Sequence, residues 1–233
     1  MKISVFSLPD IPLGKHSVKD PRLDQVDKLV KAKKKTYVQV ELVGEAEAAE
    51  ADAILVAQGS RTDLILKDLD FLDTRLGRSE SEQEKAVLNK LKLILEKEEF
   101  IFNSGLAAEE KQAISSYTLL TQKPVIVAEA SDTQDPDNLL SRALKEAGFI
   151  SFFTAGEKET RAWLIRQGAT AWEASGAIHS DIQRGFIRAE IISLDDFIQS
   201  GGETPAKQAG KMRLEQKDYV MQDADLANFR FNK

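Results

Sequence analysis

The sequence predicts an α/β protein with two domains, and three patterns along the chain carry this prediction. Over residues 1–148, short apolar segments alternate with stretches of helical periodicity, which is typical of a parallel sheet covered by helices. Between residues 62 and 121 the helical stretches follow one another without a strand, which predicts a helical arm. From residue 149 onwards the segments become shorter and are separated by glycines and turn residues, which indicates a second, smaller domain over 149–233.

The first region contains the apolar or β-branched runs expected of strands. Asp52–Gln58 is continuous in apolar residues, as in a buried parallel strand, whereas Thr36–Val43 alternates. We expect strands over residues 3–6, 36–43, 52–58 and 123–128. Apolar residues at helical spacing predict helices over 22–30, 64–76, 80–99, 107–121 and 135–148. The long central helices are expected to fold back as an antiparallel hairpin that projects from the sheet.

The second region has the pattern of a small sheet crossed by one helix. Phe149–Thr154 and Thr160–Arg166 form a predicted hairpin, and Ala169–Ser175 is a predicted short helix. Phe186–Ser193 alternates clearly, and Phe229–Asn232 supplies a last strand. This succession is typical of a β-grasp fold.

Composition limits the classes of function that the chain can have. Its 233 residues are 42% hydrophobic and 30% charged, which is ordinary for a soluble globular protein. It has no cysteine, which excludes disulfides and thiol catalysis, and its acidic residues show no metal-ligand spacing, so no metal site is predicted. No apolar run reaches the roughly 20 residues that span a bilayer, so we expect no membrane contact and a cytoplasmic location. A net charge of −6 means that any RNA contact requires a local basic patch.

Several short motifs in the second region resemble a known module. They are Gly176–Asp181, Gly185–Glu190, Gly210–Arg213 and Phe229–Asn232. Together with residues 151–170, these motifs resemble the C-terminal TGS domain of the YchF, or Obg-like, P-loop ATPases. The resemblance implies a β-grasp fold for residues 149–233 and a contact with RNA or the ribosome.

A segment near the start of the chain resembles the phosphate-binding loop of that family in a degenerate form. Such a loop needs glycines that turn backbone N–H groups inwards, a lysine for the β and γ phosphates, a Ser or Thr for Mg²⁺, and a helix that follows at once. The family has Gly-Leu-Pro-Asn-Val-Gly-Lys-Ser, whereas this chain has Ser7 for the first glycine, one inserted residue, and His16 for the hydroxyl residue. The residues of the vestigial nucleotide site are then Gly14, Lys15 and Ser17.

The sequence after this loop predicts that no nucleotide is hydrolysed. The family motif Asp-Pro-Arg-Leu-Asp-Gln follows almost at once as Asp20–Gln25, so Pro21 leaves no room for a helix after Lys15. The glycine-rich switch that holds the family's catalytic histidine is missing. At the base-reading Asn-x-x-Glu motif, the chain offers only Glu129 and Asp132. We predict no catalytic residue and no cofactor; the alternative is a switch that binds ATP or GTP with Mg²⁺ through an atypical loop.

The predicted function is that of a non-catalytic binding or regulatory protein associated with RNA or the ribosome. Arginines interspersed with aromatic residues suit phosphates and unstacked bases. The partner-contact candidates in the TGS-like region are Arg161, Arg166, His179, Arg184 and Arg188. The basic run Lys31–Lys35 is expected to be the solvated end of a helix, where cations favour the helix dipole. The helical arm is a candidate surface for a protein partner.

Overall fold

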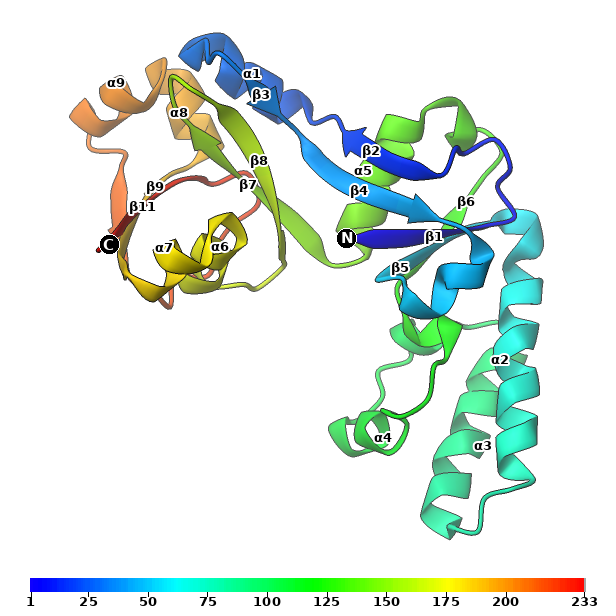
Figure 1. The fold of residues 1–233 in the computed structure, drawn as a ribbon. Coiled ribbons are helices and arrows are strands. Elements are labelled where there is room, and N and C mark those ends of the chain that lie inside the picture. The colour runs from blue at the N-terminus through cyan, green and yellow to red at the C-terminus, as the bar shows by residue number, and fades with distance from the viewer. Residues whose placement is uncertain (233) are drawn as a thin grey trace. The chain divides into compact units, whose positions relative to one another are not determined.

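The computed structural model describes residues 1–232, and residue contacts divide the chain into two compact units (Figure 1). The first unit contains Met1–His16 and Val40–Ala147, and the second contains Ser17–Gln39 together with the chain from Gly148 onwards. Residues 17–39, which the sequence predicts to be part of the first domain, therefore belong to the second unit. Within residues 1–232, no helix is long and apolar enough to cross a lipid bilayer.

The first unit is built on a five-stranded sheet with the order β2-β4-β1-β5-β6. Its strands are β1 (Lys2–Phe6), β2 (Gly14–Val18), β4 (Val38–Val43), β5 (Ala53–Ala57) and β6 (Val125–Ala128). The last two residues of β2 and the first two of β4 are counted with the second unit. β1 pairs in parallel with β4 and β5, and β5 pairs in parallel with β6. The central strands are apolar on both faces, and Ile3, Ile54 and Leu55 have no exposed surface, as expected for parallel strands. The α/β fold class is thereby confirmed.

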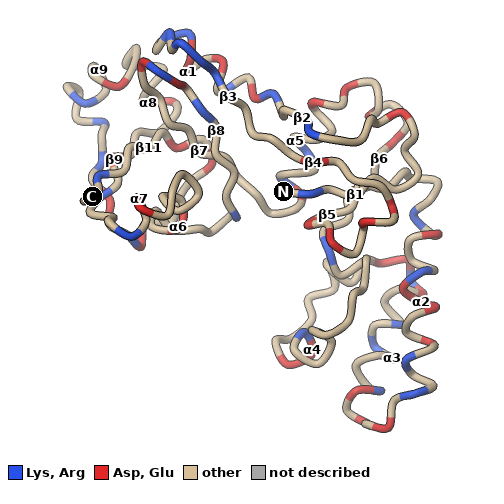
Figure 2. Tube along the Cα trace, in the orientation of Figure 1, with Lys and Arg blue, Asp and Glu red and all other residues tan. Residues whose placement is uncertain are grey.

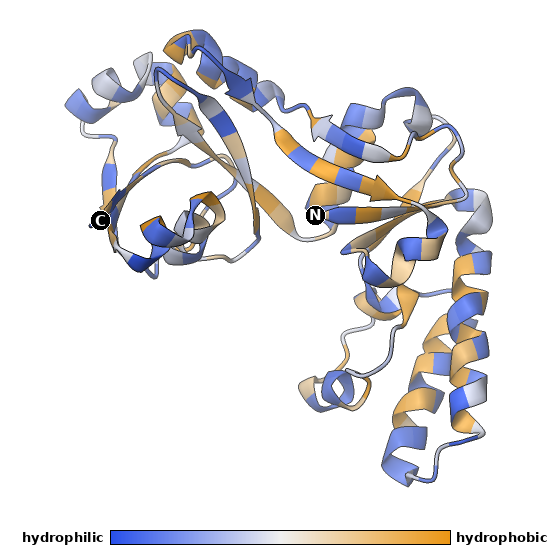
Figure 3. Ribbon diagram, viewed as in Figure 1, coloured by the Kyte–Doolittle hydropathy of each residue, from blue (hydrophilic) through white to orange (hydrophobic). Residues whose placement is uncertain are grey.

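Helices and short 3-10 turns complete the first unit. The helices are α2 (Arg61–Leu76), α3 (Glu82–Glu96), α4 (Ala108–Ala113) and α5 (Pro136–Glu146). The turns are Glu45–Glu50, Gln58–Ser60, Ile101–Asn103, Leu120–Gln122 and Asp132–Gln134. α2 and α3 lie side by side, and Figure 3 shows both banded with polar and apolar residues. Their apolar faces bury Leu64, Leu72 and Leu88 completely in one core with Ile54 of the sheet.

The helix predicted over residues 107–121 is wrong beyond residue 113. The helical geometry ends at Ile114, which follows α4 directly. The backbone N–H groups of Leu120 and Thr121 donate to the carboxylate of Asp68 in α2, at 2.9 and 2.7 Å. These donors have a tertiary acceptor 52 and 53 positions earlier in the chain, so they do not need a helical one.

The second unit is built on a six-stranded sheet with the order β10-β9-β11-β7-β8-β3. Its strands are β3 (Lys35–Thr36), β7 (Phe149–Ala155), β8 (Thr160–Arg166), β9 (Phe186–Ile192), β10 (Arg213–Glu215) and β11 (Leu226–Phe231). β7 and β8 form the predicted antiparallel hairpin. β11 lies between β7 and β9, parallel to β7 and antiparallel to β9. β3 comes from the distant 17–39 segment and extends the sheet in parallel beside β8.

Apolar side chains point to both faces of this sheet, because residues alternate along a strand, and helices pack against them. These helices are α1 (Pro21–Val30), α6 (Ala171–Ile178), α7 (Ser180–Arg184), α8 (Leu194–Ser200) and α9 (Glu203–Gln208). Phe152 packs in one core with residues of α6, β9 and β11. Its neighbour Phe153 points to the opposite face by strand alternation and is also completely buried. α1 contacts β7, β8 and α8, and its residues Leu23 and Val26 have no exposed surface, which explains why this helix belongs to the second unit.

Candidate functional site

The loop after β1 does not have the form of a phosphate-binding loop. Gly14, Lys15 and Ser17 lie in strand β2, at the edge of the sheet, and the Lys15 and Ser17 side chains are exposed on one face. An extended strand directs its backbone N–H groups sideways to a neighbouring strand, whereas a phosphate cradle needs N–H groups stacked at a helix start. As predicted, no helix follows Lys15 directly; the next helix, α1, begins at Pro21.

The carboxylate of Glu45 accepts hydrogen bonds from the polar groups at the start of this loop. Ser7 follows β1 with a φ of 55°, and its backbone N–H donates to Oε1 of Glu45 at 3.1 Å, with its hydroxyl 3.4 Å from the same oxygen. The other carboxylate oxygen of Glu45 lies 3.4 Å from Nζ of Lys67. A phosphate at this position would lose these donors to Glu45 and would be repelled by its charge. The sequence carried no signal for this contact, because Ser7 and Glu45 are joined only by folding.

The two base-contact candidates lie together in the turn after β6. Asp132 accepts the backbone N–H of Glu129 at 2.8 Å and forms an ion pair with Arg142 of α5 at 2.6 Å. Glu129 is exposed. Asp132 is therefore committed to holding its own turn. Gly14, Lys15 and Ser17 lie in β2, whereas Glu129 and Asp132 follow β6. These strands are the two edges of the sheet, so the fold does not gather the predicted nucleotide-site residues around one ligand.

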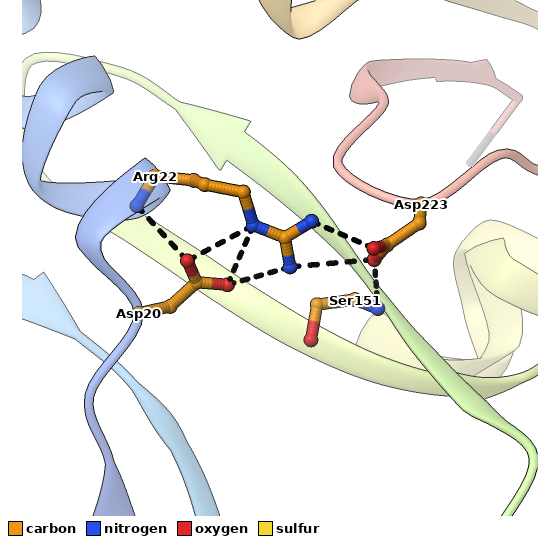
Figure 4. Close-up of polar contacts among 4 residues, drawn as sticks. All are labelled: Asp20, Arg22, Ser151 and Asp223. Carbon is orange, nitrogen blue, oxygen red and sulfur yellow. Dashed lines mark hydrogen bonds and ion pairs between the residues drawn. The ribbon is translucent and has the colours of Figure 1, made fainter. Parts of the chain in front are cut away.

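The motif Asp20–Gln25 forms an ion network inside the second unit (Figure 4). Asp20 caps α1 by accepting the backbone N–H of Arg22 at 2.9 Å. The Arg22 guanidinium bridges Asp20, at 2.9 Å, and Asp223, at 2.6 Å. Asp223 also accepts the backbone N–H of Ser151 in β7 at 3.1 Å. The hydrogen bond to Asp20, supported by Asp223 and opposed by burial, raises the pKa of Arg22 above its already high ordinary value.

This network explains the motif as a structural device of the second unit. Arg22 and Asp223 lie 201 positions apart, and their bidentate contact fixes α1 to the segment that precedes β11. Asp24 fixes α1 to the residues that follow it in the chain, because it accepts from Lys35 at 2.6 Å and from the hydroxyl of Tyr37. Sequence reasoning missed Asp223, which stands in a loop with no recognisable motif.

The predicted partner-contact residues do not form one patch. Arg161 and Arg166 belong to β8 and lie over aromatic rings, at 3.9 Å from the Trp163 centroid and 4.2 Å from that of Phe149. Arg188 is exposed on β9, which two strands separate from β8. These arginines therefore divide between two parts of the sheet.

The other two candidates border a surface hollow of about 790 Å³ near the end of β11. Arg184 forms an ion pair with Asp181, and Nδ1 of His179 lies 3.4 Å from the same carboxylate. Nδ1 of His179 also accepts the backbone N–H of Asp181, so this histidine caps α7. A capping role, together with 63% exposure of the side chain, agrees with a surface histidine and not with a catalytic one.

Comparison with known proteins places this chain beside one family. The family model YchF-GTPase_C, described as a protein of unknown function (DUF933), matches residues 149–232. The ribosome-binding ATPase YchF of Haemophilus influenzae is 35% identical in an alignment that covers 73% of this chain and 64% of that protein. The protein of the same name from Bacillus subtilis is 50% identical over 96 residues, which are 41% of this chain and 26% of that protein. The chain thus spans just under two thirds of the length of the first of these relatives.

A solved structure has the same fold. The YchF GTPase of Schizosaccharomyces pombe matches with a TM-score of 0.77, over 99% of this chain and 97% of that one. The sequence identity is 19%, so this likeness concerns the fold alone.

Proposed function

Because the chain belongs to the YchF family, we propose that it is a non-catalytic member with a degenerate P-loop, which binds RNA or the ribosome through the part of its second unit that begins at Phe149. Glu45 at the start of the loop and strand β2 in place of a helix carry the non-catalytic half of the proposal. The names of the relatives support the ribosome as the partner. The exposed Leu66 and Leu93 of the helical hairpin, at 49% and 58%, support a protein contact there as a secondary surface.

We assign the part of the second unit that begins at Phe149 as a β-grasp domain of the TGS type. A hairpin is followed by a crossing helix, and the last strand inserts beside the first strand of the hairpin in parallel. The motifs that resemble TGS domains lie in this unit. The second unit forms a continuous six-stranded sheet with its helices, whereas the residues predicted for the nucleotide site lie at opposite edges of the first sheet. A binding role that depends on this unit is therefore the function that the geometry supports best.

Neither ATP nor GTP with Mg²⁺ is expected to stabilise the protein against thermal unfolding. A ligand at 100 times its Kd would add about 2.7 kcal/mol to the free energy of unfolding, which is a readily measured shift in Tm. Lys15→Ala, at an exposed position of β2, serves as the matched variant and is expected to behave like the wild type. A nucleotide-induced shift that Lys15→Ala abolishes would instead establish the alternative of a nucleotide-dependent switch.

The wild-type protein is expected to co-sediment with ribosomes, and less so as salt rises. Arg184 and Arg188 flank the exposed Ile187 and can present guanidinium groups to phosphates. The Arg184→Ala/Arg188→Ala variant should bind more weakly and with a flatter salt dependence, since each lost phosphate contact removes about 0.7 to 0.9 from the log–log slope. A variant with Lys97→Ala and Lys111→Ala, two exposed lysines of the first unit, is the charge-matched control. Absence of co-sedimentation at low salt would rule out the ribosome as the partner, and absence of RNA binding as well would refute the proposed function.

A further inference from the structure

Four lysines form an exposed cationic rim on the second unit, at the outer side of β3 and β8. Lys31, Lys33 and Lys34 come from the segment that follows α1, and Lys158 comes from the turn between β7 and β8. We call these four residues the basic edge. Figure 2 shows lysine and arginine grouped along the end of α1, β3 and the start of β8. The two contributing segments are more than 120 positions apart in sequence, so this surface exists only in the folded unit.

The backbone of the basic edge is held in place by hydrogen bonds and does not depend on the lysine side chains. The N–H of Lys33 donates to the carbonyl of Glu157 at 3.0 Å, and the N–H of Thr160 donates to the carbonyl of Lys34 at 2.9 Å. Lys31 ends α1 in the left-handed conformation, with φ 53°, and donates its N–H to the carbonyl of Asp27. The backbone positions of these lysines are therefore fixed by folding, and a ligand need not supply the free energy to arrange this backbone.

Three of the four lysines of the basic edge have no ion-pair partner among residues 1–232. Lys34 lies 3.1 Å from Glu159, which neutralises it. Lys31, Lys33 and Lys158 form no ion pair with any residue between 1 and 232, and the one remaining carboxylate of the turn is that of the exposed Glu157. Three unpaired lysines on an ordered rim thus face solvent in a protein whose net charge is −6. A local concentration of cations against an acidic background is the electrostatic signature of a nucleic-acid contact.

From this geometry we infer that the basic edge binds the phosphate backbone of RNA. The inference rests on the proposed function and deepens it by assigning the phosphate-contacting surface of the same unit. Lysines are strongly hydrated point charges without planar recognition geometry, so they suit phosphates and not the reading of a base sequence. The basic edge itself contains no aromatic or aliphatic anchor of the kind that dominates protein–protein contacts. The basic edge adds a second phosphate-contacting surface to that of Arg184 and Arg188. It also gives the run Lys31–Lys35 a binding role beyond that of a solvated helix end.

The test measures binding of a fluorescein-labelled single-stranded RNA of 20 nucleotides by fluorescence anisotropy across a salt series. The variant Lys31→Gln/Lys33→Gln/Lys158→Gln removes the three unpaired charges. Three lost contacts should lower the log–log salt slope by about 2 and raise Kd about a hundredfold at 0.1 M salt, since each contact to a single strand contributes about 0.7. The control Lys97→Gln/Lys111→Gln/Lys145→Gln changes the net charge equally at exposed positions of the first unit and should leave Kd nearly unchanged. Because all six side chains are exposed, neither variant should alter Tm.

The outcomes separate this inference from the proposed function. Wild-type affinity in the Lys31/Lys33/Lys158 variant overturns the basic edge, as does an equal loss in the control variant. If the wild type sediments with ribosomes but does not bind the RNA, the basic edge is wrong while the proposed function stands. If the wild type binds neither, both fail together.

Discussion

Asp68→Ala is expected to destabilise the first unit by about 3 kcal/mol or more. The side chain is 2% exposed and accepts three hydrogen bonds, from the N–H of Leu120 and from the N–H and hydroxyl of Thr121. Removing the carboxylate leaves three partly or fully buried donors without an acceptor, and each such loss costs about 1–3 kcal/mol. These bonds also hold the end of the 108–122 segment against α2, so the loss should spread to the helical hairpin.

Urea unfolding followed by far-UV circular dichroism measures this effect, because α2 and α3 supply much of the helix of the first unit. Asp70→Ala, at an exposed position two residues further along α2, is the matched control and should change the free energy of unfolding little. A loss below about 1 kcal/mol in Asp68→Ala would mean that water replaces the carboxylate and that the contact does not stabilise the segment.

The same pair of proteins should respond differently to pH. Burial raises the pKa of Asp68 in the folded state above its unfolded value, in spite of the hydrogen bonds from Thr121 and Leu120. Between these two pKa values the folded state binds more protons than the unfolded state, so the free energy of unfolding falls as pH rises through this window. The stability advantage of the wild type over Asp68→Ala should therefore grow on acidification from pH 7 towards the unfolded pKa of 3.8. A constant difference would contradict the raised pKa.

Leu23→Ala is expected to destabilise the second unit by about 2–5 kcal/mol, although Leu23 is over 120 residues before the start of β7. Leu23 has no exposed surface and lies on the face of α1 that packs against the sheet and α8. Its truncation removes apolar contacts and leaves a cavity, and both terms contribute to the cost. Both tryptophans of the chain, Trp163 and Trp172, belong to the second unit, so tryptophan fluorescence reports its unfolding selectively.

The control for this experiment is Leu29→Ala on the same helix, where the side chain is 40% exposed. It should shift the urea midpoint much less, because little apolar surface and no closed cavity are involved. If Leu23→Ala left the fluorescence transition unchanged, α1 would not be part of the cooperative second unit, and the Arg22–Asp223 contact would be peripheral.

Local periodicity was sufficient to predict most elements that bury their own apolar residues. The run Asp52–Gln58 predicted β5, and the leucine spacing predicted α2 and α3. The same principle holds for the hairpin of β7 and β8, whose alternation is visible in the chain. In each case the burial pattern repeats every two or 3.6 residues, so a short window of sequence contains the information. The loss of the helix after Lys15 was predictable for the same local reason, since Pro21 lies within a few residues.

Contacts between residues that are distant in the sequence determined the features that no short stretch of sequence could predict. Asp68 accepts the backbone N–H groups of Leu120 and Thr121 where a helix was predicted, Glu45 accepts from Ser7, and Asp223 binds Arg22. Each partner is a common acidic residue in an unremarkable setting, and only the fold brings it within hydrogen-bonding distance. The residues of a motif can therefore persist in the sequence while their role depends on the tertiary structure: Asp20–Gln25 here ties α1 to the second unit, because its charged side chains find their partners there.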